Sequence, residues 1–303
     1  MQEFFLQTEF GCIHCCQWLP EGQPVGVVQL IHGLCDYTAR YAELARYLAD
    51  RGYAVVGGDH PGHGGSVGEG DQYGYLTGGW MGAVKLVHLL YQKTRAEFSG
   101  LPYVMLGHSM GSFLLRTYLY TYHVDLAGAI LSGTCWQPEA ALPAAALLCR
   151  EEAKRLGERS SSPLLQNMVF GSYNRKFAPA RTDYDWVCTR EEVVDAYARD
   201  PGCTWLPTIQ LCTEMMKGIA MNQKSSNLSR MQKDLPVYFF AGQLDPVGDM
   251  GNGVLKAVLA FKKAGMKDVL VELYPHMRHE CHNEPGREKV FADIFNWMED
   301  RRK

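Results

Sequence analysis

Several features that mark whole classes of protein are missing from this sequence. No apolar stretch reaches the roughly 18 residues that a membrane-spanning helix needs. The first residues have neither the basic region nor the apolar run of a signal peptide. Positive charge is not in excess, because 30 Lys and Arg face 33 Asp and Glu, giving a net charge of -3. We therefore expect a cytoplasmic protein with no transmembrane segment and no affinity for nucleic acid.

The cysteines do not form the dense framework of a small disulfide-rich domain. Ten of them are scattered over 303 residues, and in a cytoplasmic protein they are expected to be free thiols. Cys12 and Cys15, with His14 between them and Cys16 beside them, suggest part of a zinc site. No second Cys-x-x-Cys pair follows, and the segment has the pattern of a β-strand. We expect neither a metal nor a cofactor.

What is present is a regular alternation of strand and helix patterns. Two short patterned runs, 3–8 and 12–18, flank Phe10-Gly11 and predict a β-hairpin. Beyond it, short apolar runs alternate with amphipathic segments, which is typical of βαβ units. The strands are expected at 25–31, 53–56, 104–106, 127–131, 237–241 and 269–273, and the helices at 38–51, 80–98, 110–122, 251–264 and 286–300. The pattern predicts an α/β fold with a mostly parallel central sheet flanked by helices.

The alternation stops between residues 136 and 234. This stretch has helical segments near 139–157 and 206–221, around a polar middle without a convincing core strand. Because structureless loops of such length are uncommon, we predict a helical cap at 136–234. The α/β core would then comprise residues 1–135 and 235–303.

One cap helix has an apolar stripe along one face. Within 206–221, the spacing of three, four and three residues is that of a helical surface, formed by Ile209, Cys212, Met216 and Ile219. A lid that lines an acyl-chain tunnel would have this pattern. A cap helix packed on the main domain would have it equally, so both interpretations stay open.

A Gly-x-Ser-x-Gly pattern identifies a candidate nucleophile. Residues 107–111, GHSMG, follow an apolar strand and precede a long helix, which is the setting of a strained turn that exposes a serine hydroxyl. A second match, residues 64–68, lies among turn residues that do not begin a helix well. Context therefore favours Ser109 over Ser66 as the nucleophile.

A serine nucleophile needs a base and an acid that orients the base. In this architecture they follow in the order Ser, Asp or Glu, His, each in a loop after a late strand. Asp245 and His279 occupy such positions. Nearby alternatives are a helix-capping aspartate and two histidines that could be surface residues, namely Asp249, His276 and His282.

Acyl transfer also needs backbone donors for the oxyanion. We expect one from the amide after the nucleophile, Met110, and the other from Leu34, in the loop after the strand at 25–31. Gly33 would let that backbone approach. His32, His60 and His63 lie in nearby motifs, and we expect them to stabilise turns or the oxyanion loop rather than to bind metal.

The motifs together resemble the monoacylglycerol lipase and lysophospholipase branch of the α/β-hydrolases, which is also grouped with serine aminopeptidase-like hydrolases. Residues 32–41, HGLCDYTARY, are similar to HGxxEHSxRY, and residues 59–66, DHPGHGGS, to DxxGHGxS. Residues 102–111 resemble the strand leading to GHSMGG. Residues 242–247 and 274–280 resemble GxxDPV and YPGxRHE.

This resemblance implies an α/β-hydrolase fold and a serine hydrolase that cleaves carboxylic esters through an acyl-enzyme. It implies a lipid-like ester, monoacylglycerol or lysophospholipid, as the substrate. It also selects His279 over its neighbours and assigns Ser66 to a structural loop. The sequence departs from the family at four positions, none of which removes a catalytic group: Asp36, Tyr37, Ser112 and His276.

Other functions use the same residues. The triad would also serve a peptidase, an arylamidase or an acyltransferase, and a weakly catalytic binding protein is a further alternative. An aminopeptidase would need cap carboxylates for the substrate ammonium, for which the candidates are Glu151, Glu152, Asp183 and Asp185. Acidic residues on a cap are usually solvated. Transient contact between the cap and a membrane surface stays open, as does the oligomeric state.

Overall fold

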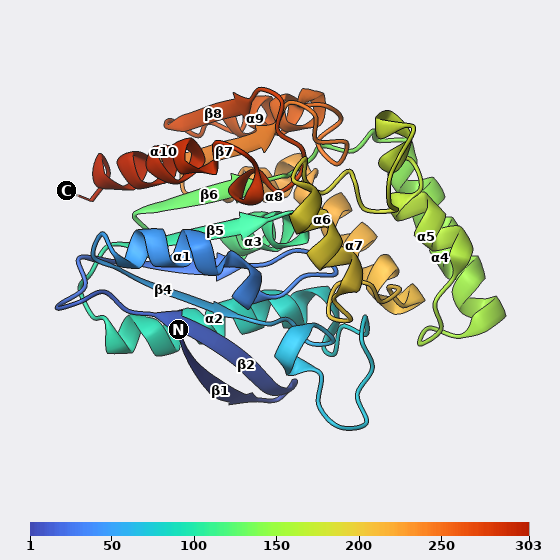
Figure 1. Ribbon diagram of the computed structural model, residues 1–303, viewed down its shortest axis with the longest axis horizontal. Helices are drawn as coiled ribbons and strands as arrows, with labels where there is room; N and C mark the ends of the chain where they lie inside the picture. The colour runs from blue at the N-terminus through green and yellow to red at the C-terminus, as the bar shows by residue number, and fades with distance from the viewer. Residues whose placement is uncertain (303) are drawn as a thin grey trace.

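An eight-stranded sheet runs through the computed structural model, which describes residues 1–302 (Figure 1). The strand order is β1-β2-β4-β3-β5-β6-β7-β8. Strands β3 to β8 are mutually parallel, whereas β1 and β2 are antiparallel to each other and β2 is antiparallel to β4. The strands are β1 Gln2–Thr8, β2 Gly11–Trp18, β3 Gly26–Ile31, β4 Tyr53–Gly58, β5 Tyr103–His108, β6 Gly128–Ser132, β7 Val237–Gly242 and β8 Val269–Tyr274. The predicted hairpin and parallel sheet are confirmed.

Helices cover both faces of the sheet because the strands are apolar on both sides. Val27 and Val28 are neighbours on β3, yet they belong to opposite hydrophobic cores, as the alternation of side chains along a strand requires. One core packs against α1 (Ala42–Ala49) and α10 (Arg287–Glu299). The other packs against α2 (Gly79–Glu97), α3 (Met110–Thr121) and α9 (Asn252–Lys263).

The chain between β6 and β7 is helical. It contains α4 Ala141–Leu156, α5 Pro163–Phe170, α6 Glu191–Arg199, α7 Ile209–Asn222 and α8 Ser225–Leu228. The helices expected at 139–157 and 206–221 are confirmed as α4 and α7, whereas α5, α6 and α8 were not predicted. Helices α4 to α7 lie beyond the ends of β5 and β6 to which the strand arrows point, with α4 and α5 outermost (Figure 1).

Helix α7 is bonded to the sheet-covering helices. Near its start, Gln210 exchanges two hydrogen bonds with the backbone of Leu76, and farther along Glu214 accepts one from the Trp80 N–H. At its end, the Asn222 amide donates to the Phe113 carbonyl and accepts from the Thr117 hydroxyl, both on α3. Helix α4, by contrast, packs mainly on α7.

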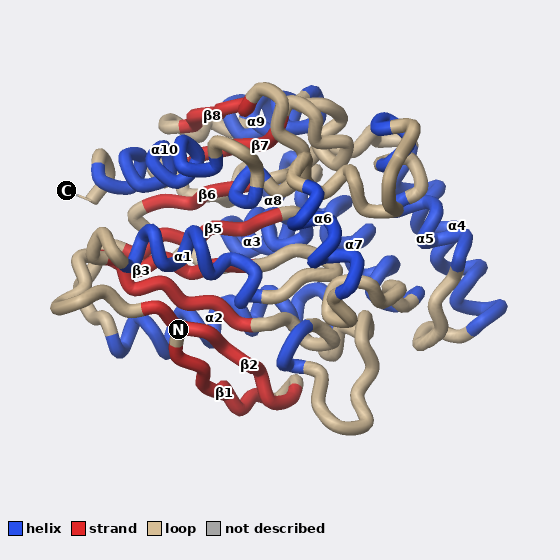
Figure 2. Tube along the Cα trace, in the orientation of Figure 1, coloured by secondary structure: helices blue, strands red, loops and turns tan. Residues whose placement is uncertain are grey.

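The sheet brings four predicted site loops to one edge. The loops after β3, β5, β7 and β8 all follow the carboxyl ends of parallel strands, and such ends meet at the same edge of a sheet. Figure 2 shows loops gathered on the side of the sheet where α6 and α7 lie. Among residues 1–302, no helix has the length and apolar character needed to cross a membrane. All ten cysteines are free thiols, and nine of them are buried.

Candidate active site

A cavity of about 470 Å³ lies between this edge of the sheet and the helices α4, α5 and α7. Ser109, His279, Leu34 and Met110 line it. Asp245 lies behind His279, with none of its surface exposed. Most of the remaining wall is apolar, and it includes Phe113, Leu142, Leu148, Met168, Met215 and Ile219. The structure therefore gathers the predicted site residues at one mostly apolar cavity.

Ser109 stands on a strained turn between β5 and α3. Its φ is 52°, in a region that non-glycine residues seldom occupy. The flanking glycines are required by contact: a Cβ on Gly107 would lie 2.5 Å from the Gly111 carbonyl oxygen, and a Cβ on Gly111 would lie 2.0 Å from that of Ile31. The two glycines of the Gly-x-Ser-x-Gly pattern are therefore required because neighbouring backbone leaves no room for a side chain at either position.

His279 and Asp245 form a buried hydrogen-bonded pair. The His279 Nδ1–H donates to Oδ2 of Asp245 over 3.0 Å, and the histidine is 3% exposed. Burial lowers the pKa of His279, but the charge and the hydrogen bond of Asp245 outweigh it, so the net pKa is raised above its ordinary value. Because the carboxylate holds the proton on Nδ1, Nε2 of the neutral ring is an acceptor.

The ring of His279 is held by residues that sequence reasoning missed. A Cβ on Gly133, just after β6, would lie 2.9 Å from Cε1 of the imidazole and 3.1 Å from Nδ1. The ring centroids of His108 and Trp186 lie 4.6 Å and 5.2 Å from that of His279. The one signal for Gly133 in the sequence was its place at the carboxyl end of a predicted strand.

Two residues that line the cavity, Leu34 and Met110, have backbone amides without internal partners in the described part of the chain. Among residues 1–302, neither the Leu34 nor the Met110 N–H donates to a protein acceptor. Met110 is the first residue of α3, where the helix dipole favours negative charge. Gly33 brings the loop close, since a Cβ there would lie 3.1 Å from Cβ of Ser109.

An ion-pair network links this loop to the histidine loop. Arg40 donates to Asp36 and to Glu280, each over 2.8 Å, and Asp36 accepts the Gly33 N–H over 3.0 Å. Burial alone would raise the pKa of Asp36, but the charge of Arg40 dominates among groups that hold it well below its usual range. Asp36 therefore stays ionised and holds the loop that carries Leu34.

The competing candidates lie elsewhere or are already engaged. Ser66 accepts the His14 N–H and donates to the Asp59 carbonyl, so it belongs to a turn away from the cavity. His276 is exposed, and Asp249 lies in a turn with a φ of 51°. His282 is not a surface residue: it is 3% exposed and stacks on Tyr41 with ring centroids 4.7 Å apart.

The three histidines near the site form a buried cluster. The Nε2 of His32 accepts the His60 N–H over 2.9 Å, and His63 contacts the Pro61 carbonyl over 3.0 Å. Burial lowers the pKa of His63 to about 3 and that of His60 well below its ordinary value. The hydrogen bonds of these rings connect turns, as the motif positions predicted.

The acidic residues of the predicted cap do not line the main cavity. Glu152 is bound by Arg155 and Ser162, and Asp185 accepts hydrogen bonds from the backbone of 181–182. The carboxylates that line the cavity are Asp36 and Glu280, and both are paired with Arg40.

The apolar stripe on α7 combines both interpretations left open by the sequence. Ile209 and Cys212 are buried in the hydrophobic core, where they hold the helix on the main body. Met215, Met216 and Ile219 line the cavity. One helix thus packs on the sheet-covering layer at its start and forms a cavity wall farther along.

The comparisons with known proteins agree with this geometry. Residues 22–286 match a family model described as serine aminopeptidase S33. The monoacylglycerol lipase of Mycolicibacterium smegmatis is 26% identical over 283 residues, which cover 93% of this chain and 90% of that protein. The human monoglyceride lipase is 25% identical over 298 residues, covering 95% and 87%. The crystal structure of a thermostable carboxyl esterase from Bacillus coagulans in complex with glycerol matches with a TM-score of 0.91 and 26% identity, covering 100% and 99%.

Proposed function

This chain belongs to the serine aminopeptidase S33 family of α/β-hydrolases and hydrolyses esters, and from that premise we propose that its substrate is a monoacylglycerol. The observation that carries the proposal is the mostly apolar cavity of about 470 Å³ that Ser109 lines. A cavity of this size suits one small lipid. The names of the relatives from Mycolicibacterium smegmatis and human support the same substrate class.

The proposed reaction is acyl transfer to Ser109 and then to water. The Ser109 hydroxyl attacks the ester carbonyl while Nε2 of His279 takes its proton, and Asp245 holds the imidazole in the required tautomer. The N–H groups of Leu34 and Met110 stabilise the oxyanion. His279 returns the proton to the departing alcohol, and it then activates the water that releases the fatty acid.

The cavity wall supports a binding mode in which the ester group of the substrate lies at Ser109 and its acyl chain lies against apolar side chains. The side chains of α4 and α7 offer an apolar surface for the acyl chain, as with Leu148 and Met215. We propose that residues 136–234 act as the cap that supplies this surface. Leu147 and Leu164, on α4 and α5, are 59% and 50% exposed, which supports transient contact of the cap with a membrane surface. We place the enzyme in the cytoplasm.

The alternative activities have less support in the site. An aminopeptidase would need a free carboxylate for the substrate ammonium, whereas Asp36 and Glu280 are both ion-paired with Arg40. An acyltransferase would use the same intermediate, with an alcohol in place of water. A binding protein would have no use for the strained turn at Ser109.

The test is a comparison of initial rates on a long-chain monoacylglycerol, a short aryl ester and an aminoacyl arylamide. We expect the monoacylglycerol to have the highest kcat/KM, with all activity lost in Ser109→Ala. Ser66→Ala is the matched control, because Ser66 lies in the second Gly-x-Ser-x-Gly match and outside the cavity. It should keep activity and still react with a serine-directed phosphonate.

Each other outcome has a definite meaning. Preference for the arylamide would refute the lipid substrate while leaving Ser109 as the nucleophile. Activity that survives in Ser109→Ala would refute the nucleophile. Phosphonate labelling without turnover of any of the three substrates would favour the weakly catalytic binding protein.

A further inference from the structure

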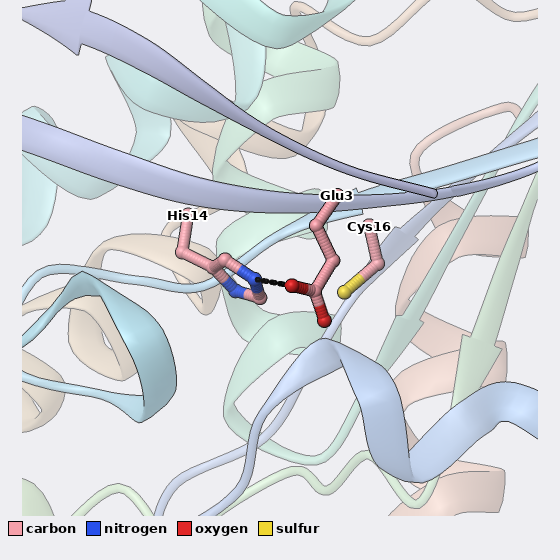
Figure 3. Close-up of side chains that lie close together, drawn as sticks. All are labelled: Glu3, His14 and Cys16. Atoms are coloured by element: carbon pink, nitrogen blue, oxygen red, sulfur yellow. Dashed lines mark ion pairs between the residues drawn. The ribbon is translucent and has the colours of Figure 1, made fainter. Parts of the chain in front are cut away.

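A second group of chemically reactive side chains lies on the N-terminal hairpin, outside the active-site cavity. Glu3 on β1 is directly opposite Cys16 on β2, and His14 is two residues before Cys16 on the same face of that strand. The donor atoms of the three side chains all lie within 4.8 Å of one another. Figure 3 shows the three side chains converging, with His14 Nε2 and Glu3 Oε2 3.8 Å apart.

The alternation of side chains along β2 places the two cysteines of the Cys-x-x-Cys pattern on opposite faces of the strand, and places His14 and Cys16 on the same face. Cys12 and Cys15 differ by an odd number of positions, so they point to opposite faces of β2. Cys15 packs into one hydrophobic core and Cys16 into the other. The Cys-x-x-Cys pair is therefore not a chelating pair, whereas His14 and Cys16 share a face with a carboxylate from the neighbouring strand.

His14 is held in the orientation of a metal ligand. Its Nδ1 is bonded to Oδ2 of Asp59 over 2.9 Å, which leaves Nε2 directed toward Glu3. The ring also lies against the backbone of Gly65, where a Cβ would come within 2.7 Å of Cγ. Metal-binding histidines characteristically pair their second ring nitrogen with a carboxylate in this way, which orients the ring and raises its basicity.

The local charge favours a cation. Two carboxylates contact the His14 ring, Glu3 at 3.8 Å from Nε2 and Asp59 at 2.9 Å from Nδ1. Their negative charges would attract a divalent ion. Glu3 is exposed, so an ion can enter from solvent.

We propose that Glu3, His14 and Cys16 bind one Zn²⁺ ion, with water as the fourth ligand. The mixture of carboxylate, imidazole and thiolate donors suits zinc and does not suit Mg²⁺ or Ca²⁺, which take oxygen ligands. In a tetrahedral zinc site the donor atoms are about 3.3–3.8 Å apart, so these side chains must close by at most about 1.5 Å. On binding, the S–H bond of Cys16 breaks, its proton leaves to solvent and a sulfur–zinc bond forms.

Such an ion would join β1 to β2 by a bond other than the backbone ladder. It would also fix His14, whose partner Asp59 accepts the N–H groups of Thr38 and Gly65. The site is distinct from the triad, because His279 and Ser109 contribute no donor to it. Metal binding at the hairpin and ester hydrolysis can therefore be measured separately.

The experiment titrates the metal-free full-length chain with Zn²⁺ by calorimetry and with Co²⁺ by absorption. Cys12→Ser serves as the parent, because Cys12 is the exposed thiol and would bind metal by itself. We expect one ion per chain and a thiolate-to-Co²⁺ charge-transfer band. Cys16→Ser should abolish the band, and Glu3→Gln should weaken Zn²⁺ binding by about tenfold or more. Glu9→Gln, an exposed change on the same hairpin, should leave both unchanged.

The outcomes that overturn the proposal are equally concrete. A Co²⁺ spectrum without the thiolate band would refute Cys16 as a ligand, and equal Zn²⁺ affinity in Glu3→Gln and its parent would refute the site. Variants of buried Cys16 can unfold, so the exposed Glu3→Gln change decides in that case. At equal concentration, Zn²⁺ should raise the Tm of the parent and of Glu9→Gln by more than that of Glu3→Gln.

Discussion

Replacing Gly133 with alanine should displace the imidazole of His279 while leaving the chain folded. The added Cβ would lie 2.9 Å from Cε1 and 3.1 Å from Nδ1 of the ring. Carbon atoms in ordinary contact are about 3.5–4.0 Å apart, so the ring must move by roughly 0.6 Å or more. That movement stretches the 3.0 Å hydrogen bond to Asp245 and changes the direction of Nε2.

The expected effect is on turnover rather than on folding. Misplacement of a catalytic group by about 1 Å costs about 100-fold in rate, so kcat/KM should fall by about 10- to 100-fold. This corresponds to about 1.4–2.7 kcal/mol of transition-state stabilisation. The positive φ of 57° adds backbone strain of about 1–2 kcal/mol, which lowers Tm by a few degrees.

A matched control distinguishes contact of the new methyl group with His279 from the backbone strain of alanine at a positive φ. Gly100 also has a positive φ, of 79°, but a Cβ there would meet nothing within 4 Å. Gly100→Ala should therefore reduce the Tm in a similar way and leave kcat/KM unchanged. Initial rates on a short aryl ester and thermal unfolding of both variants provide the measurement. Activity of Gly133→Ala within about twofold of wild type would refute the reasoning, as would an equal loss in Gly100→Ala.

Three further predictions follow from the site. Burial lowers the pKa of His279, but Asp245 raises it more, so the net pKa lies above 6.5. The kcat/KM on an uncharged ester should therefore fall as the pH drops, with the midpoint of the acidic decline above pH 6.5. A midpoint below pH 6.5 would contradict this expectation. Leu148→Trp should fill part of the cavity and lower the rate on long-chain monoacylglycerol by about tenfold or more, while the rate on the short aryl ester serves as the control. An equal change in the two rates would argue that Leu148 does not contact the acyl chain. Arg40→Met removes the cation that pairs with the buried carboxylates of Asp36 and Glu280. The free energy of unfolding, measured by urea titration, should fall by about 3–5 kcal/mol. A loss below about 1 kcal/mol would show that the network does not stabilise the fold.

The sheet and the loops of the candidate site could be predicted because buried parallel strands leave a continuous apolar signal. All six residues of β3 are buried, and so are all six of β5 and of β7. Ser109 and Asp245 come shortly after β5 and β7, whereas His279 follows β8, which is mostly half-buried. The two glycines around Ser109 added a local steric requirement that the sequence states directly.

The rest depends on contacts between residues far apart in the chain. Arg40 and Glu280 are 240 residues apart, and no local pattern indicates that they meet. Helix α6 is short and strongly charged at its start, so it is held by the burial of Val194 and Tyr197 rather than by an extended apolar stripe. The hairpin register that places Glu3 opposite Cys16 is likewise a pairing between strands, which composition does not reveal.

The two helices that form much of the cavity wall, α4 and α7, are attached differently to the helix that follows Ser109. Helix α7 is hydrogen-bonded to α3, whereas among the described residues α4 is not. Asn222 binds the end of α7 to α3, and Arg116 on α3 donates to the backbone carbonyls of Asn222 and Cys135. A displacement of α7 would therefore pull on the helix that begins beside Ser109. Helix α4 packs mainly on α7, so its displacement would change the width of the cavity without that strain. If the proposed acyl chain lies in this cavity, we expect substitutions on α4 to alter chain-length preference independently of catalytic rate, and substitutions at the end of α7 to change both together.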